Sequence, residues 1–238
     1  MGRYVVTGAS SGIGLEIALQ LAAQGHGVIA LGRDRERLRN LALRDRRIEV
    51  RVLDIRDRAA VAALAAELAG ADVIDGLINN AAIQHNVRLD DRLYGADEIA
   101  DEIETNLVAP LILSRLLLPR TPARPFVIVN VGSALACYPK ATSAVYSATK
   151  AGLRMFSDAL RVQFDGTPVR VVDVVLPVVD TPMTAGRGRG KITAGAAAAA
   201  IVRALEPGPA RLHVGKAKLL RLLQLVAPPV AAAIIRKL

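Results

Sequence analysis

Short, nearly continuous apolar runs alternate along the chain with longer segments of mixed or alanine-rich character. The runs are rich in valine and isoleucine, which is typical of strands buried on both faces of a parallel sheet. They lie at residues 4–7, 28–31, 50–53, 73–79, 126–131, 169–176 and 211–214. The segments between them predict helices at residues 13–25, 34–43, 57–69, 97–118, 144–164 and 194–205. This alternation predicts an α/β fold with a doubly wound parallel sheet of seven strands and helices on both faces.

The pattern predicts one domain over residues 1–238, with two segments that depart from it. Residues 184–191 hold three glycines within five positions, which predicts a mobile loop that is either a plain solvent loop or a substrate lid. Residues 218–238 are apolar with scattered bases, and three interpretations stay open for them. They pack against the body or a second copy, lie on a membrane surface, or are disordered. A Pro-Pro pair and charges interrupt the segment, so a membrane-spanning helix is not expected.

Composition narrows the functional classes. The 31 basic residues exceed the 22 acidic ones, giving a formal net charge of +9, but acids are interleaved with the bases where these are densest. Aromatic residues make up only 3% of the chain, so a nucleic-acid surface is not expected. A single cysteine and three scattered histidines predict neither a disulfide framework nor a metal site. Together with the missing secretory signal, this favours a cytoplasmic protein.

A glycine-rich turn follows the first predicted strand, and a helix begins directly after it. In this turn Gly8 allows a tight bend, Gly12 lets a pyrophosphate approach the backbone, and Gly14 lets the helix pack closely on the strand. The free N–H groups of the helix would face the phosphates. The strand–turn–helix context therefore predicts a dinucleotide site.

The end of the second predicted strand indicates which dinucleotide is bound. An acidic residue there would favour NAD, but the chain has Gly32 followed by Arg33. A guanidinium grips a 2′-phosphate, so we expect NADP(H), with NAD(H) still possible. We interpret the next residue, Asp34, as the N-cap of the following helix.

A phenol and an amine lie four residues apart, at Tyr146 and Lys150, on one face of a predicted helix. A nearby cation stabilises a phenolate, so we expect the pKa of Tyr146 to fall from about 10 towards neutrality. That shift would suit the phenol to general acid–base catalysis.

These motifs occur in the order typical of the short-chain dehydrogenase/reductase family, which the chain resembles. The shared features are the TGxxxGxG turn, the run Asn79–Ala82, a serine thirteen residues before Tyr146, and the segment 176–183. Two departures are Ala82 and Val178, where the family usually has glycine. Within the family, segments 32–38, 77–84 and 214–220 are similar to a bacterial subgroup related to the oxidoreductase of the teichoic-acid D-alanylation operon.

The resemblance implies a Rossmann-type fold and assigns residues to the site. The implied catalytic residues are Asn106, Ser133, Tyr146 and Lys150. The implied cofactor contacts are Gly8, Ser10, Ser11, Gly12, Ile13, Gly14, Arg33, Asp54, Ile55, Asn80, Ala81, Tyr146, Lys150, Pro177 and Thr181. In this scheme Ser133 orients the reacting oxygen, Lys150 holds the ribose, and Asn106 anchors a water that relays protons.

The implied activity is hydride transfer between NADP(H) and a carbonyl compound or secondary alcohol of low molecular weight, in a homodimer or homotetramer. Two alternatives stay open: a non-catalytic NADP(H)-binding sensor, and a membrane-surface member acting on a lipid-like or anionic substrate. The loops expected to line the substrate site contain residues 83–86, 135–140 and 184–191. In them His85 is either an acid or a surface residue, and Cys137 is a wall residue. The bases Arg187, Arg189 and Lys191 form a candidate clamp for an anion.

Overall fold

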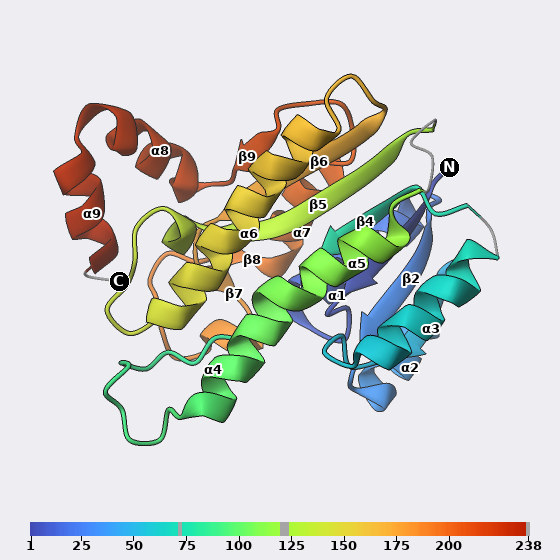
Figure 1. Ribbon diagram of the computed structural model, residues 1–238, viewed down its shortest axis with the longest axis horizontal. Helices are drawn as coiled ribbons and strands as arrows, with labels where there is room; N and C mark the ends of the chain where they lie inside the picture. Colours follow the sequence, from blue (N-terminus) through green and yellow to red (C-terminus); the bar gives the residue numbers. More distant parts are fainter. Residues whose placement is uncertain (71–72, 120–123, 237–238) are drawn as a thin grey trace.

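Seven parallel strands form one twisted sheet in the computed structural model, which describes residues 1–70, 73–119 and 124–236 (Figure 1). The order across the sheet is β3-β2-β1-β4-β5-β6-β9, and every pairing is parallel. The strands are β1 Arg3–Thr7, β2 Gly27–Gly32, β3 Ile48–Val52, β4 Gly76–Asn79, β5 Phe126–Ser133, β6 Val169–Leu176 and β9 Arg211–His213. The predicted doubly wound sheet is confirmed.

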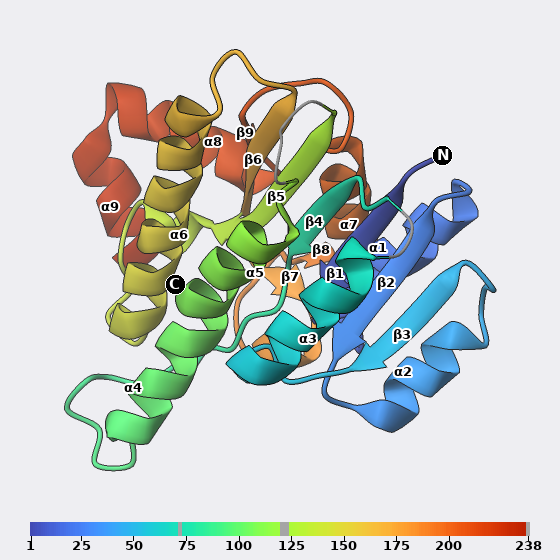
Figure 2. The same cartoon turned by 45° about the vertical axis from the view of Figure 1, so that its right-hand side comes forward.

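Helices cover both faces of this sheet, each over its own hydrophobic core. Side chains of α1, α2 and α7 pack on one face, and side chains of α3, α5 and α6 pack on the other, which faces the viewer in Figure 2. The helices are α1 Gly12–Ala23, α2 Arg35–Ala42, α3 Arg58–Ala69, α4 Ala96–Ile103, α5 Ala109–Leu117, α6 Ala144–Gln163, α7 Ala194–Arg203, α8 Lys216–Val226 and α9 Pro228–Arg236. Because both faces are covered, the central strands are mostly apolar, as the sequence pattern indicated.

Two features of the chain path differ from the sequence expectation. The helix expected at 97–118 is interrupted by a π-helical turn, Glu104–Val108, between α4 and α5. A second, two-stranded sheet joins β7 Val179–Asp180 to β8 Ile192–Thr193. Strands of two residues carry no recognisable alternation, so the sequence analysis missed them. Their pairing holds together the two ends of the glycine-rich loop, residues 184–191.

The carboxyl ends of β1 and β4 are tied together where the strand order reverses direction. The Thr7 hydroxyl is 1% exposed and accepts hydrogen bonds from the backbone N–H groups of Asn80 and Ala81, each at 2.9 Å. The Asn80 side-chain amide donates in turn to the Thr7 carbonyl at 2.9 Å. Ligands of doubly wound sheets bind at such a switch point, and here its geometry is fixed by buried hydrogen bonds.

The C-terminal segment is helical as far as residue 236, and residues 237–238 lie outside the described part. Leu220 of α8 and Ala231 of α9 are buried against Leu135 and Tyr138, in the loop that follows β5. Packing against the body is therefore the interpretation that these residues bear out. The opposite side of α8 stays in solvent, with Leu222 56% exposed. None of the described helices combines the length and the apolar character needed to cross a membrane.

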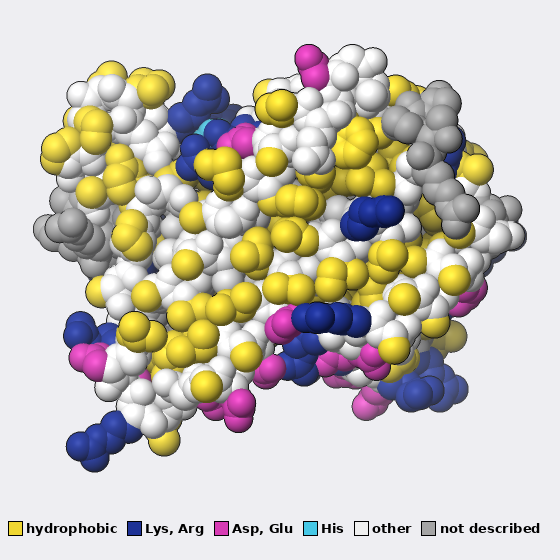
Figure 3. Space-filling view, viewed as in Figure 1, with side chains coloured by type: hydrophobic (Ala, Val, Ile, Leu, Met, Phe, Trp, Pro, Cys, Tyr) yellow, Lys and Arg dark blue, Asp and Glu magenta, His cyan; other side chains and the backbone are white. Residues whose placement is uncertain are grey.

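Hydrophobic side chains are spread over the outer surface of α5 and α6, the face turned towards the viewer in Figure 3. Leu116 of α5 and Met155 and Val162 of α6 are 39%, 67% and 79% exposed. Apolar surface of this kind commonly marks a contact with another chain. The homodimer or homotetramer expected from the resemblance stays a prediction.

Candidate active site

The glycine turn between β1 and α1 has the conformation that its glycines were expected to permit. Gly8 and Gly12 have φ values of +69° and +55°, which L side chains rarely adopt. A Cβ atom on Gly14 would lie 2.2 Å from the Gly8 carbonyl oxygen, so the helix approaches the turn too closely for any side chain. The path of this turn is set by the backbone and requires glycine.

The N-terminus of α1 is open to an anion. Its N-cap residue, Ser11, makes no side-chain capping hydrogen bond, and the first turn contains no acidic residue. The N–H groups of that turn and the positive end of the helix dipole therefore remain available. They border a cavity of about 430 Å³, which we call the glycine-turn cavity.

The glycine-turn cavity gathers most of the residues expected to contact the cofactor. Those that line it are Gly8, Ser10, Ser11, Ile13, Arg33, Asp54, Ile55, Asn80, Ala81 and Thr181. Gly12 and Gly14 shape the turn behind it, and Tyr146, Lys150 and Pro177 line the neighbouring cavity described below. Its volume, its open helix terminus and its mixed apolar and polar lining fit a dinucleotide.

Four charged side chains surround the end of β2 in this cavity. Asp34 caps α2, as expected, by accepting from the Arg37 N–H at 3.0 Å. Asp54 pairs with Arg56 at 2.7 Å, and hydrogen bonds from Arg56 lower the pKa of its carboxyl. The Arg33 guanidinium, 62% exposed, lies 3.9 Å from Asp54. Arg37, in the first turn of α2, also lines the cavity; sequence analysis missed it, although it lies only four residues after Arg33.

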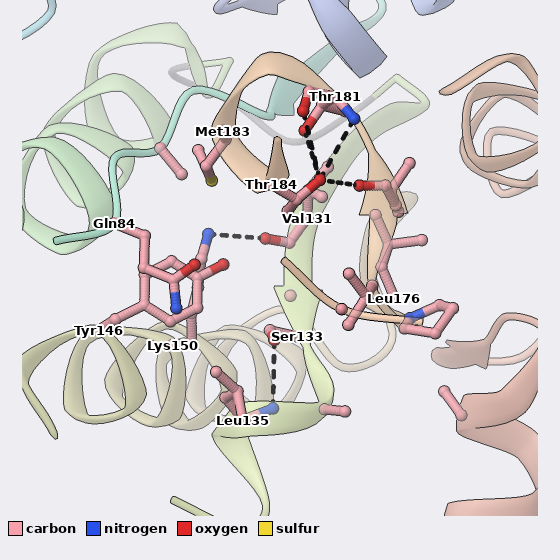
Figure 4. Close-up of a pocket in the computed structure, with 18 of the residues that line it drawn as sticks. Gln84, Val131, Ser133, Leu135, Tyr146, Lys150, Leu176, Thr181, Met183 and Thr184 are labelled. Atoms are coloured by element: carbon pink, nitrogen blue, oxygen red, sulfur yellow. Dashed lines mark hydrogen bonds between the residues drawn. The ribbon is translucent and has the colours of Figure 1, made fainter. Parts of the chain in front are cut away.

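A second cavity, of about 400 Å³, adjoins the first and contains the expected catalytic side chains; we call it the Tyr146 cavity. Tyr146 and Lys150 project from α6, and Ser133 lies across from them at the end of β5 (Figure 4). The Lys150 ammonium is 5.7 Å from the centre of the Tyr146 ring. The two cavities share Asn80 and Thr181 in their linings, so a molecule held in one reaches the other.

The acidity of the phenol differs from the sequence expectation. Burial raises the pKa of Tyr146 to about 12, and a hydrogen bond with Ser133 opposes this rise only in part. The Lys150 amine, 2% exposed, donates to the Val131 carbonyl at 2.9 Å, and burial lowers its pKa to about 8. The expected fall of the tyrosine pKa towards neutrality is therefore wrong for the protein alone. Desolvation raises the pKa of Tyr146 more than the Lys150 ammonium can lower it, because this ammonium faces the ring and donates its hydrogen bond to another residue.

Asn106 occupies the π-helical turn and is fully buried. Its side-chain oxygen accepts from the Ile83 N–H, and its amide donates to the Ile83 carbonyl, both at 2.8 Å. The amide thus holds the backbone that leaves β4, between the two cavities. Whether it also anchors a water, as the resemblance implies, stays a prediction.

Only some residues of the loops that were expected to line the substrate site border the Tyr146 cavity. Gln84, Asn86, Leu135, Lys140, Arg187 and Arg189 line the Tyr146 cavity. Lys191 does not, because its ammonium pairs with Asp180 at 3.1 Å and donates to the Thr184 carbonyl, so its place in an anion clamp is wrong. Cys137 lines a separate cavity beside Arg154, so it is no wall residue of this one.

His85 lies outside both cavities. It belongs to a small cluster formed by the loop between β4 and α4 and by α4 itself. Its ring lies 5.5 Å from that of Tyr94, whose hydroxyl donates to Glu102 at 2.7 Å. Glu102 is fully buried, and burial raises the pKa of its carboxyl. The cluster holds the loop between β4 and α4 against α4.

Residues of α8 were not anticipated in the site. Lys216, Ala217 and Leu220 line the Tyr146 cavity. No local motif marks them, because their role depends on how the C-terminal helices pack onto the loop after β5.

Comparison with known proteins places this geometry in a family. A family model for short chain dehydrogenases matches residues 3–191. The chain is 40% identical over 182 residues to the uncharacterized oxidoreductase DltE of Bacillus subtilis, covering 74% of this chain and 71% of DltE. It is 37% identical over 177 residues to the NADP-dependent 3-hydroxy acid dehydrogenase YdfG of Escherichia coli K12, covering 71% and 69%.

Solved structures agree with this assignment. A short chain dehydrogenase from Burkholderia cenocepacia in complex with NADP superposes with a TM-score of 0.88 at 26% identity, covering 98% of this chain and 97% of that one. Both the family resemblance and the similarity to the bacterial subgroup are confirmed. The chain is an oxidoreductase of the short-chain dehydrogenase/reductase family.

Proposed function

We propose that the protein catalyses NADP(H)-dependent interconversion of a ketone and a secondary alcohol. The observation that carries this proposal is the junction of two cavities, one fitted to a dinucleotide and one lined by Ser133, Tyr146 and Lys150. Support comes from YdfG, which is named as NADP-dependent, and from the NADP complex of the Burkholderia structure.

The residues around the glycine turn would hold the cofactor. The N-terminus of α1 and the backbone of the turn suit the pyrophosphate, and Arg33 with Arg37 suits a 2′-phosphate. Residue 32 is a glycine, so no carboxylate repels that phosphate there. When bound, the nicotinamide supplies a hydride to the carbonyl carbon in reduction, or accepts one in oxidation.

The chain's own side chains manage the proton. With a pKa of about 12, Tyr146 keeps its proton at neutral pH and is ready to donate it to the carbonyl oxygen as negative charge develops there. Ser133 is placed to hydrogen-bond the same oxygen. Lys150 is placed to hold the ribose and, by its charge, to stabilise the phenolate left behind, which regains a proton from solvent.

A test separates chemistry from binding. Tyr146→Phe removes the proton donor while keeping the ring, so NADPH oxidation with a ketone should fall at least about a thousandfold, within the range attributed to general acid catalysis. NADPH affinity, measured by fluorescence, should stay within about twofold of the wild type, since Tyr146 does not line the glycine-turn cavity. Tyr138→Phe is the matched control, because Tyr138 packs under α8 and lines neither cavity. Full turnover by Tyr146→Phe would refute the proposal.

A further inference from the structure

The charged side chains that line the Tyr146 cavity all have the same sign. Besides Lys150 they are Lys140, Arg187, Arg189 and Lys216, and none of the described side chains in that lining is a carboxylate. Cations gathered in a cavity with apolar walls raise the local concentration of anions.

Two of these cations, Lys140 and Arg187, have no acidic partner among the residues that the structure describes. In the part of the chain that the structure describes, Lys140 donates only to the Asn86 side-chain oxygen at 3.1 Å, and Arg187 only to the Met183 carbonyl. The charge of Arg187 acts on both Lys140 and Tyr146: after burial it is the second cause that lowers the pKa of Lys140, and it slightly opposes the rise in the pKa of Tyr146. Both cations therefore face the Tyr146 cavity and are available to a ligand.

Part of the remaining wall is apolar and comes from α8. Leu220 and Ala217 of α8 line the cavity, and Leu220 packs against Leu135, which lies just beyond Ser133 in the chain. The α8 residues lie outside residues 3–191, the part that the family model matches. A cavity that offers cations on one side and aliphatic side chains on another fits an amphiphilic molecule.

The glycine-rich loop and α8 meet at the edge of the cavity. The Lys216 ammonium lies against the backbone of Gly190, where a Cβ atom would be 2.2 Å from its Nζ. Gly188 packs in the same way against Val178, with a Cβ position 2.8 Å from Cγ1. The cations of the loop and of α8 thus line one rim.

We infer that the physiological substrate is an amphiphilic anion whose carbonyl lies at Ser133 and Tyr146, whose carboxylate or phosphate is held between Lys140 and Arg187, and whose aliphatic part packs on Leu220. This inference rests on the proposed function for its chemistry. It adds the substrate class and makes α8 a specificity element.

Turnover gives the first test. The isomeric oxohexanoates are compared with their methyl esters as substrates for NADPH oxidation, and the best acid should exceed its ester at least about tenfold in kcat/KM, the effect of one charge-assisted contact. The variant Lys140→Gln/Arg187→Gln should abolish that preference by raising KM for the acid alone. The control Lys218→Gln/Arg203→Gln removes two exposed cations that line neither cavity and should leave the preference intact.

Binding without turnover gives the second test, by calorimetry on the protein saturated with NADP⁺. Hexanoate or hexyl phosphate should bind at least about tenfold more tightly than hexanamide, and comparing the two anions separates carboxylate from phosphate. Leu220→Ala should weaken the favoured anion several-fold by removing buried contact. Leu219→Ala, one residue away and 59% exposed, should leave it unchanged.

The outcomes separate the inference from the proposed function. Esters reduced as well as acids, or anions bound no better than hexanamide, would overturn the inference and leave the reductase function standing. Hexanoate bound through Lys140 and Arg187, with no ketone reduced, would support the anion site and overturn the function.

Discussion

The two adjoining cavities differ in how their walls are made. The glycine-turn cavity is shaped largely by backbone, and its Arg33 and Arg37 are accompanied by Asp34 and Asp54. The Tyr146 cavity is shaped by side chains from distant segments, as far along the chain as Leu220, and its charges are all positive. The first is a site of fixed geometry with balanced charge, while the second gains its character from tertiary packing. Substitutions in the two cavities should therefore have different consequences.

The largest effect on cofactor binding is expected where backbone geometry leaves no room. Gly14→Ala would place a Cβ atom 2.2 Å from the Gly8 carbonyl oxygen, so the turn must move. We expect NADPH affinity, measured by fluorescence titration, to fall at least about a hundredfold, equivalent to about 2.7 kcal/mol.

Gly195→Ala is the matched control, because it too lies in the first turn of a helix. Its Cβ atom would be 3.6 Å from the nearest atom, the Glu16 carboxylate, which is ordinary contact. That variant should bind NADPH as the wild type does. Equal affinity in Gly14→Ala would show that the turn is not held by backbone packing.

The next effect is on stability and concerns the buried amine of Lys150 in the Tyr146 cavity. Burial lowers the pKa of Lys150 from 10.5 to about 8. Between these two pH values the unfolded chain holds a proton that the folded protein has released, so unfolding takes up a proton and a rise in pH disfavours it. Without cofactor, the folded protein should gain about 3 kcal/mol of stability from this group across the window.

Denaturant unfolding of the wild type and Lys150→Met, at pH values from neutral to alkaline, measures this gain as the change in the difference between the two free energies. Tyr146, whose pKa is raised, acts in the opposite direction only above about pH 10 and is common to both proteins. Lys218→Met, which removes an exposed lysine, should follow the wild type at every pH. Parallel curves for the wild type and Lys150→Met would mean that Lys150 is not desolvated in the folded protein.

The same contrast explains how far sequence alone could lead. The strands of the seven-stranded sheet, Gly8, Gly14 and the Asp34 cap were predictable because each depends on neighbours in the chain. The acidity of Tyr146 was not, since it depends on desolvation by surrounding elements and on the bond from Lys150 to Val131. The role of α8 in the site was equally out of reach, because nothing in its residues indicates which loop they cover.

The smallest effect is expected at Arg33. Its guanidinium is exposed and forms an ion pair with the Asp54 carboxylate at 3.9 Å. Arg33→Ala should weaken NADPH binding about tenfold and leave NADH unchanged, because only NADPH carries the 2′-phosphate that a guanidinium grips. Arg35→Ala is the control, an exposed neighbour that does not line the cavity. Equal losses for both nucleotides would mean that Arg33 supports the ribose or the fold of the loop. A selective but modest loss would support a share of the phosphate for Arg37, which lies in the first turn of α2 and lines the same cavity.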